Sequence, residues 1–302
     1  MDWQDATCYL NGEWLPLKDA RIPVLDRGFI FGDGVYEVIP VDEVAPGRSG
    51  PFRAREHFER LARSLAAVRI ANPFDLDGWQ RLLAESIARN AAWPRQSFYL
   101  QVTRGVARRD HPFPAGVTPT VFAMSTPWAP IPREQIEQGI AVVTHADERW
   151  LHCDIKSVSL LGNVLMKQYA VEHNASETVM LRDGWLTEGS STNVLVVRGG
   201  TLIAPQKSNR ILPGITYDAA FDIARARGVP VQARPIPEAE LRAADEVWIS
   251  SSGRDVLPAV RIDGAPVGDG RPGPLYRQMI EWFGQAKRED GKRWLAQYGA
   301  VA

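Results

Sequence analysis

The chain of 302 residues lacks the features that mark secreted, membrane or disulfide-rich proteins. Cys8 and Cys153 are its only cysteines, too few for a disulfide framework and without the spacing of metal ligands. No apolar run approaches the ~18 residues that a membrane span needs, and no basic region followed by an apolar one opens the sequence. These absences predict free thiols, a cytoplasmic location and no membrane partner.

An excess of either charge is also missing, since 35 Lys and Arg stand against 36 Asp and Glu. The chain therefore has no global field that would attract nucleic acid, although local basic groups could still hold a phosphate. What the sequence does have is a hydrophobic fraction of 45%, enough at this length to bury a sizeable core. Chains of this length usually form two domains.

The order of local signals predicts a mixed α/β protein with two domains. Residues 1–126 combine alternating strand patterns with two amphipathic helices, expected near 53–69 and 77–92. A Pro-rich segment at 127–133 is expected to be the interdomain linker. Residues 134–302 form the second domain, in which turn signals separate several hairpins.

Glycine and proline indicate the local structure of the N-terminal part. Asn11-Gly12 predicts a tight hairpin turn, residues 23–41 are expected to form a glycine-punctuated β-type stretch, and residues 42–51 a loop. Gly32-x-Gly34 lacks the third glycine and the following helix of a dinucleotide-binding loop. At the other end, the sequence after about residue 289 predicts no structure.

Lys156, within the stretch DIKSVSLLGNVLMKQ, is the first candidate for chemistry. It stands between a polar turn and an apolar, helix-like run, and we expect that run to belong to a packed interior. Burial disfavours a charged ammonium, so a lysine in such a place can act as a nucleophile and form a Schiff base with a carbonyl. Most lysines that open a helix are simply solvated, so Lys156 alone decides nothing.

A second stretch, LRDGWLTEGSSTNVLVV, places Glu188 in a Gly/Ser/Thr-rich turn between two strand-like runs. Together the two stretches resemble the core signature of fold-type IV pyridoxal-phosphate enzymes, the D-amino acid and branched-chain aminotransferase family. The resemblance extends over nearly the whole chain. It implies a smaller N-terminal α/β domain and a larger C-terminal domain with a barrel-like β core.

The resemblance implies a role for each residue that matches a family motif. Lys156 would hold pyridoxal 5'-phosphate and move the substrate proton, while Glu188 would pair with the pyridine nitrogen. No metal is implied. The pattern Glu56-His57-x-x-Arg60-Leu61 marks Arg60 as a phosphate ligand. The other expected cofactor-binding residues are Leu212, the amides of Ile215 and Thr216, and the hydroxyls of Ser251 and Ser252.

Three further matches indicate the substrate. In RGFIFGDGVYEV, Tyr36 would face the substrate, with Val38 two residues further along the strand. In the loop VARRDHPFP, Arg109 and His111 match a pair that binds the substrate α-carboxylate in D-amino acid aminotransferases. These enzymes are homodimers with a shared active site, which implies that Arg109 and His111 serve the neighbouring subunit. We therefore expect transamination between a D-amino acid, such as D-alanine or D-glutamate, and 2-oxoglutarate or pyruvate.

Other activities on the same fold stay open. Branched-chain aminotransferases usually carry an arginine where this chain has Val38 and Pro40. Aminodeoxychorismate lyases and (R)-amine transaminases share the lysine and the glutamate, and the Arg109/His111 pair counts against both. Outside catalysis, the chain could be a cofactor-binding protein or a dimerisation module. The joint presence of Lys156, Glu188 and the phosphate-binding set disfavours these two alternatives.

Overall fold

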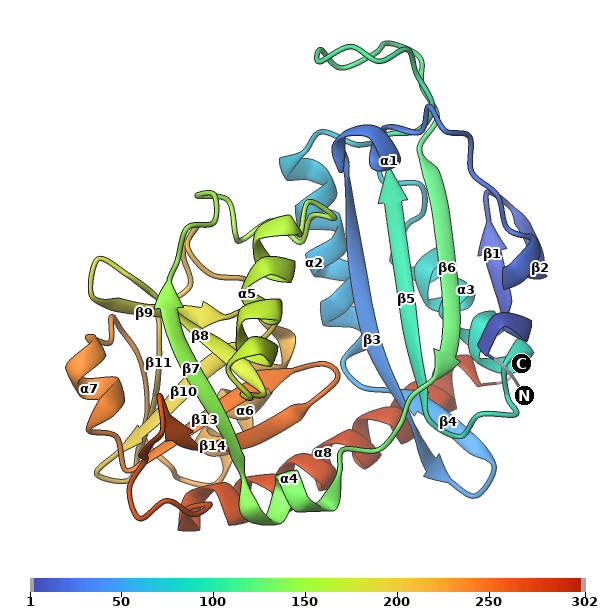
Figure 1. Ribbon diagram of the computed structural model, residues 1–302. Helices are drawn as coiled ribbons and strands as arrows, with labels where there is room; N and C mark the ends of the chain where they lie inside the picture. The colour runs from blue at the N-terminus through green and yellow to red at the C-terminus, as the bar shows by residue number, and fades with distance from the viewer. Residues whose placement is uncertain (1–2, 300–302) are drawn as a thin grey trace. The chain divides into compact units, whose positions relative to one another are not determined.

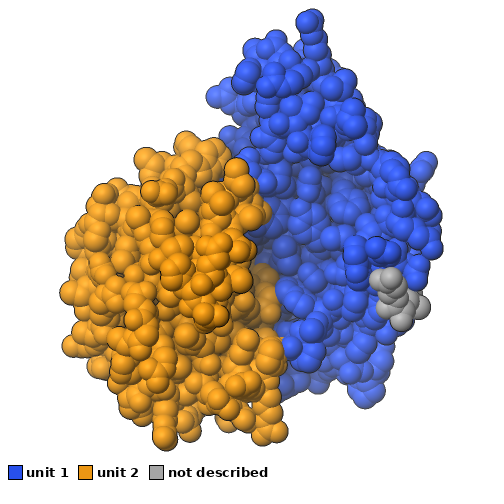
Figure 2. Space-filling model, in the orientation of Figure 1, with its two compact units in different colours: residues 1–130, 155–159, 287–302 blue, residues 131–154, 160–286 orange. Residues whose placement is uncertain are grey.

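The computed structural model describes residues 3–299, and the chain divides into two compact units (Figure 2). Unit 1 comprises residues 1–130, 155–159 and 287–302, and unit 2 comprises residues 131–154 and 160–286. Residues 155–159 and 287–302 belong to unit 1 although they follow the expected linker at 127–133. A single division of the sequence at that linker cannot place them there. The domain boundaries expected from the sequence stay a prediction.

Unit 1 is built on a six-stranded antiparallel sheet (Figure 1). The strand order is β2-β1-β6-β5-β3-β4. Helices α2 and α3 pack on this sheet, as the apolar spacing of their sequences predicts. The elements are β1 (Thr7–Leu10), β2 (Glu13–Pro16), α1 (Arg27–Phe31), β3 (Gly34–Ala45), β4 (Arg48–Pro51), α2 (Ala54–Ala67), α3 (Leu76–Arg89), β5 (Gln96–Thr103) and β6 (Thr120–Pro127).

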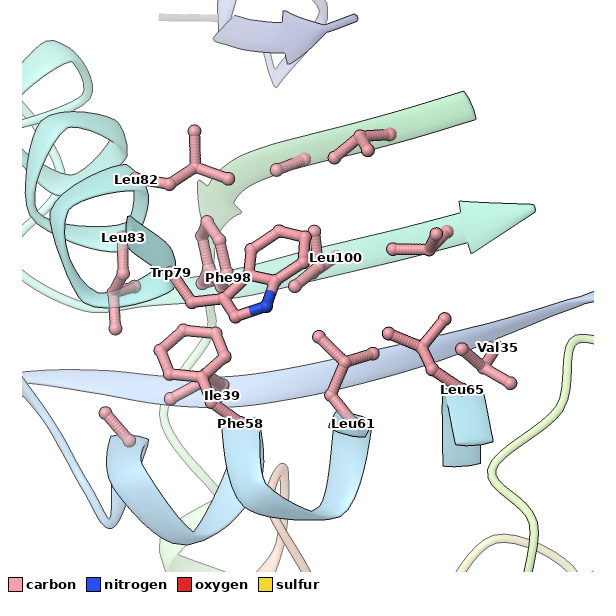
Figure 3. Packing of buried hydrophobic residues seen from close by; sticks show 14 of the residues in the cluster. Val35, Ile39, Phe58, Leu61, Leu65, Trp79, Leu82, Leu83, Phe98 and Leu100 are labelled. Atoms are coloured by element: carbon pink, nitrogen blue, oxygen red, sulfur yellow. The ribbon is translucent and has the colours of Figure 1, made fainter. Parts of the chain in front are cut away.

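The core of unit 1 lies between the two helices and the sheet (Figure 3). Aromatic rings fill its centre, where the indole of Trp79 on α3 stacks on the ring of Phe58 on α2. Each large apolar side chain buried in this way contributes roughly 1.5 to 3 kcal/mol to folding. The labelled members of the cluster are Val35, Ile39, Phe58, Leu61, Leu65, Trp79, Leu82, Leu83, Phe98 and Leu100.

Turn chemistry explains the local structure of unit 1, including two wrong expectations. The hairpin at Asn11 and Gly12 is confirmed, with positive φ at both residues. The stretch 23–41 is not entirely β-type, because the Asp26 carboxylate caps a short helix that ends at Gly32 in the left-handed region. Residues 42–51 are not a loop either, since β3 continues to pair with β4.

Unit 2 contains a curled, mixed nine-stranded sheet (Figure 1). Its main path runs β12-β11-β10-β13-β14-β7-β8-β9, and β15 pairs with β14. Together with unit 1, this sheet confirms the α/β fold class. The strands are β7 (Ile140–Ala146), β8 (Glu177–Arg182), β9 (Trp185–Gly189), β10 (Asn193–Arg198), β11 (Thr201–Ala204), β12 (Val231–Ala233), β13 (Glu246–Ser251), β14 (Asp255–Ile262) and β15 (Ala265–Pro266).

The helices of unit 2 differ in how much of their surface is buried. Helix α6 packs on β13 and β14 with its apolar face. Helix α5 follows Lys156 and is exposed, with 72% of Leu161 and 58% of Val164 accessible, so the expected packed interior around this run is wrong for the single chain. The helices are α4 (Arg133–Gln138), α5 (Leu161–Glu172), α6 (Ile215–Ala226), α7 (Glu238–Arg242) and α8 (Pro274–Tyr298).

Helix α8 continues past residue 289, where the sequence predicted no structure. The Asp290 carboxylate accepts a hydrogen bond from the amide of Arg53, and the Trp294 indole donates to Gln80 on α3. These contacts within unit 1 hold the last turns in place. Over residues 3–299, none of the helices combines the length and the apolar character that crossing a membrane requires.

Candidate active site

The backbone of Lys156 is fixed by β3 and α2 of unit 1. The Tyr36 amide donates to the Lys156 carbonyl at 2.9 Å, and Ser157 forms an isolated antiparallel bridge with Val35. From α2, the hydroxyl oxygen of Ser64 accepts a hydrogen bond from the Lys156 amide at 3.3 Å. The lysine therefore lies on a short extended segment that is held at the side of a strand, before the helix that the sequence pattern indicates.

The side chain of Lys156 lies against Tyr36. Its Nζ atom is 4.2 Å from the centroid of the Tyr36 ring, and this ring stacks on Tyr99 with the centroids 5.8 Å apart. Burial raises the pKa of Tyr99 to about 12, so its hydroxyl stays neutral at physiological pH. An aromatic face thus limits the positions open to the half-buried amine.

Glu37 follows Tyr36 along β3, and a buried charge network forms around it. Arg60 binds the carboxylate through Nε and Nη2, each at 2.8 Å, and the ring of His57 lies 2.7 Å from the same carboxylate. Burial alone would raise the pKa of Glu37, but the Arg60 guanidinium and His57 hold it at about 2. Glu37 is therefore ionised at all moderate pH values, and a phosphate on Arg60 would share this guanidinium with Glu37.

His57 has its pKa lowered, first by burial and further by the positive charges of Arg60 and Lys156, although Glu37 opposes the shift. The shift favours a neutral imidazole between two fixed charges. The histidine of the Glu56-His57-x-x-Arg60 pattern is thus part of the structure that orients Arg60.

In unit 2, Glu188 near the end of β9 is a buried carboxylate with three hydrogen-bond donors. Arg149 donates to Oε1 at 2.6 Å, while the Asn193 amide and the backbone N–H of Leu212 donate to Oε2 at 3.0 and 2.9 Å. Burial nevertheless raises the pKa of Glu188 to about 7, against the opposing effect of Arg149. The carboxylate is incompletely neutralised, so a cationic group placed beside it would strengthen its ionised form.

Arg149 is shared between two carboxylates, which explains why it neutralises Glu188 only in part. Its Nε donates to Asp147 at 2.9 Å, and its Nη2 donates to the second oxygen of Asp147 at 3.0 Å. Thr187, next to Glu188 on β9, also donates to Asp147. Burial works toward a higher pKa of Asp147, but the hydrogen bond from Arg149 outweighs it and lowers this pKa. The Asp147 carboxylate therefore stays charged. Asp147 and Arg149 were not predicted as site residues.

Beside Glu188, the N-terminus of α6 presents the expected backbone amides. Ile215 and Thr216 open the helix and are buried, and the N-cap Gly214 supplies no side chain to cap it. A Cβ on Gly214 would lie 1.9 Å from the Asn193 carboxamide oxygen. Only glycine therefore allows the chain to approach Asn193 here while the Asn193 carboxamide also donates to the Leu212 carbonyl.

Ser251 and Ser252 lie at the same end of the sheet as Asn193. On β13, Ser250 is opposite Asn193 of β10, and Ser251 and Ser252 come directly after it. Both serines are half-buried, and α6 packs on the same strand. The structure thus brings Leu212, Ile215, Thr216 and the two serines to one end of unit 2.

Arg109 and His111 belong to unit 1. They are exposed on the loop between β5 and β6, which projects beyond the ends of these strands (Figure 1). The ring of Phe31 on α1 lies 5.5 Å from the ring of His111 and 5.5 Å from the Arg109 guanidinium. Val38 is half-buried and shares the face of β3 that carries Tyr36.

The comparisons with known proteins identify the family of this chain. The sequence matches the model of the family Amino-transferase class IV over residues 34–262, and the chain belongs to this family. The expected fold-type IV resemblance is confirmed. Within residues 3–299, no group of three His, Cys, Asp or Glu side chains could hold a metal ion.

Two curated relatives show how far the sequence similarity extends. The chain is 38% identical over 276 residues to a D-alanine aminotransferase of Staphylococcus haemolyticus, covering 91% of this chain and 95% of that protein. It is 37% identical over 277 residues to the D-alanine aminotransferase of Listeria monocytogenes, covering 91% of this chain and 93% of that protein. The similarity therefore includes both units.

Solved structures of branched-chain amino acid aminotransferases have a similar fold. The enzyme of Escherichia coli matches with TM-score 0.85 and 26% identity, covering 95% of both chains. A second branched-chain enzyme, solved with pyridoxamine 5'-phosphate, matches with TM-score 0.89 and 26% identity, covering 98% of both chains. These matches confirm the expected architecture over nearly the whole chain.

Proposed function

We propose that the protein transaminates D-amino acids with a 2-oxo acid such as 2-oxoglutarate or pyruvate, using pyridoxal 5'-phosphate. The observation that carries the proposal is the Arg109-x-His111 pair. The lysine and the glutamate of this fold also serve other reactions, so this pair is what favours D-amino acid substrates. The identity to D-alanine aminotransferases over most of the chain supports it, and structural similarity to branched-chain enzymes at lower identity favours the alternative only weakly.

The residues present fit this cofactor. A pyridinium nitrogen suits the incompletely neutralised Glu188 carboxylate, whose pKa burial raises to about 7. A phosphate suits the uncapped amides of Ile215 and Thr216, with Ser251, Ser252 and Arg60 as further donors. The primary amine of Lys156 beside Tyr36 suits the aldehyde.

When bound, the cofactor supplies an electron sink for the pair left on the substrate Cα. Lys156 would hold the cofactor through Nζ, and its amine, once released, would be the acid-base group that moves the proton at the substrate Cα. Glu188 keeps the pyridine nitrogen protonated, and Arg149 holds the Glu188 carboxylate in place. No metal takes part in this proposal.

Carboxylate recognition decides which substrates react. Arg109 and His111 bind the α-carboxylate, and Tyr36 faces the same group from β3. Holding the carboxylate on one side fixes which bond of Cα points at Lys156, so only one configuration of the amino acid loses its proton efficiently. Val38, which shares the Tyr36 face, lies beside the substrate side chain.

A panel of half-reactions tests the proposal. The holoenzyme is mixed with single D-amino acids, single L-amino acids and (R)-phenylethylamine, and the absorbance of the bound cofactor is followed as it accepts the amino group. We expect D-alanine or D-glutamate to convert it fastest. Faster conversion by an L-branched amino acid than by any D-amino acid would show a branched-chain enzyme instead, and (R)-phenylethylamine as the best donor would show an amine transaminase.

We further infer a homodimer in which Arg109 and His111 serve the active site of the neighbouring subunit. Two properties support it: the loop that carries them is exposed in the single chain, and apolar side chains are exposed both on this loop and on α5. Leu161, Val164 and Leu165 on α5 would be covered in such an assembly. The cytoplasmic location stays a prediction from the sequence.

Subunit exchange tests the shared site. Lys156→Ala and Arg109→Ala, each expected to be inactive on D-amino acids, are mixed under conditions that exchange subunits. With random pairing about half of the dimers are mixed, each with one intact site, so about a quarter of all sites regain activity. Activity that stays at the level of the separate variants, despite proven exchange, would mean that Arg109 serves its own chain.

A further inference from the structure

Two buried arginines and one aspartate form a cluster at the base of the loop between β5 and β6. Asp33 accepts a hydrogen bond from Nε of Arg27 at 2.8 Å and from Nε and Nη2 of Arg104 at 2.7 and 3.0 Å. Arg27 is only 3% exposed and Arg104 only 7%. Burial of Asp33 works toward a higher pKa, but Arg104 and Arg27 lower it, so the carboxylate stays charged between them.

Arg27 connects this cluster to the residues that we assign to carboxylate binding. Its Nη1 donates to the carbonyl oxygen of Asp110 at 2.5 Å and its Nη2 to that of His111 at 3.3 Å. Its backbone amide donates to the Gly105 carbonyl at 2.9 Å, at the start of the same loop. Arg27 therefore restrains the loop at its start through its backbone, and at Asp110 and His111 through its buried side chain.

The rest of the cluster supports the same arrangement. Phe31 lies one helical turn after Arg27 on α1, with its ring 4.7 Å from the Arg27 guanidinium and in contact with Arg109 and His111. Arg104 stacks 3.7 Å above the ring of Phe113, further along the loop. The side chains of Arg27, Phe31 and Arg104 thus hold the loop, and the backbone of Leu25 adds a hydrogen bond from the Ala107 amide.

We propose that Arg27 is a positioning residue for substrate carboxylate binding: held by Asp33, it fixes the backbone that presents Arg109 and His111. The proposal rests on the proposed function. A guanidinium offers a rigid fork of donors, so it can bind Asp33 on one edge and two carbonyls on the others, which a lysine cannot do. Fixing the loop before the substrate arrives lowers the ordering cost of binding.

The experiment compares a substrate that has a carboxylate with one that lacks it. D-alanine and D-alaninol, in which a hydroxymethyl group replaces the carboxylate, are each reacted with the holoenzyme in single turnovers. The measured quantity is the ratio of their second-order rate constants. Arg27→Met is compared with Arg109→Met and with Arg108→Met, a control at an exposed arginine of the same loop. Hydrogen exchange of residues 105–112 is followed on the same holoenzymes.

We expect Arg27→Met to lower the ratio by about 10- to 100-fold, chiefly because D-alanine reacts more slowly, and to speed hydrogen exchange in the loop. Arg109→Met lowers the ratio with the loop still protected, and Arg108→Met changes neither. Arg27→Lys, which keeps the charge beside Asp33, is expected to have an intermediate effect. It also serves as the test variant if Arg27→Met does not fold.

Three results would overturn the proposal. An unchanged ratio in both Arg27 variants, with Arg109→Met impaired, would show that Arg27 does not position the pair. An equal loss on both substrates would show a merely structural role. An unchanged ratio in Arg109→Met would remove the carboxylate role of Arg109, and with it the basis of this inference, while a ratio changed only by Arg109→Met leaves the proposed function intact.

Discussion

Each unit buries one glutamate against an arginine, and the two pairs have opposite electrostatic outcomes. In unit 1, Arg60 binds both oxygens of Glu37, and the pKa of this carboxyl falls to about 2 despite burial. In unit 2, Arg149 reaches only one oxygen of Glu188 because Asp147 takes its other nitrogens, and burial raises the pKa of Glu188 to about 7.

The difference shows that the pKa of a buried glutamate depends on how many carboxylates share its arginine, and not only on the presence of the arginine. Glu37 is fully compensated and serves to hold Arg60 and His57 in place. Glu188 keeps an unmet preference for a positive neighbour, which suits a group that must hold a proton on a bound ring. The raised pKa of Glu188 therefore indicates a binding residue, and the lowered pKa of Glu37 indicates a structural residue.

Lys156→Ala tests whether the reacting amine belongs to unit 1, the unit that contains the Glu37–Arg60 pair. We expect D-amino acid turnover to fall by at least about 10⁴-fold, because the variant loses both its nucleophile and its acid-base group. Borohydride reduction of the wild type followed by peptide mapping is expected to find the cofactor on Lys156. The matched variant Lys167→Ala is expected to stay active, and cofactor on Lys167 would refute the assignment.

Glu188→Gln tests the unit 2 side. A neutral amide no longer favours a protonated pyridine, so single-turnover proton removal from Cα is expected to slow by about 10²- to 10³-fold with the cofactor still bound. Turnover rate and bound cofactor are both measured, with Glu238→Gln as the control at a partly exposed glutamate paired with Arg242. An undiminished rate in Glu188→Gln would contradict the proton-holding role.

Glu37→Gln sharpens the comparison through stability. Removing the charge takes from the buried Arg60 the carboxylate that binds two of its nitrogens, and the free energy of unfolding at pH 7 is expected to fall by roughly 3 to 5 kcal/mol. Glu59→Gln, at a partly exposed glutamate paired with Arg55, is expected to change it by less than about 0.5 kcal/mol. Denaturant unfolding measures both. Equal losses in the two variants would show that Glu37 is not a compensated buried charge.

The pH dependence of stability separates the two glutamates by sign. With a folded pKa of about 7, above the ordinary 4.5, Glu188 stabilises the cofactor-free fold least at high pH, and its contribution is lost as pH rises from 4.5 to 7. The stability of cofactor-free Glu188→Gln relative to wild type is expected to rise by up to ~3 kcal/mol across this window. Glu37, with its folded pKa of about 2, loses its contribution as pH falls below 4.5. A flat difference curve for Glu188→Gln would contradict the raised pKa.

Local signals in the sequence predict most of the fold. Asn11-Gly12 sets a hairpin, and the Asp75 carboxylate caps α3, because each signal acts within a few residues. Helix α1 was missed since its five residues are too few to show a helical period. The continuation of β3 to Ala45 was missed because the prolines and glycines of residues 46–51 indicated a loop.

The site divides in the same way between local and long-range signals. Lys156 and Glu188 stand in motifs that can be found without a structure. Arg149 was missed because only the sheet order places it beside Glu188: β8 lies between β7, which precedes Arg149, and β9, which carries Glu188. The Arg27 contacts span 83 residues of sequence to reach Asp110, and no local pattern predicts such a pair.

Residues 155–159 add a consequence for protein engineering. The chain leaves unit 2 for these five residues, pairs once with β3 so that Lys156 meets Tyr36, and then returns to unit 2. An exchange of the first 130 residues between two relatives would therefore combine a tyrosine from one parent with a lysine from the other. Chimeras of this family need a crossover on each side of residues 155–159, so that the tyrosine and the lysine come from the same parent.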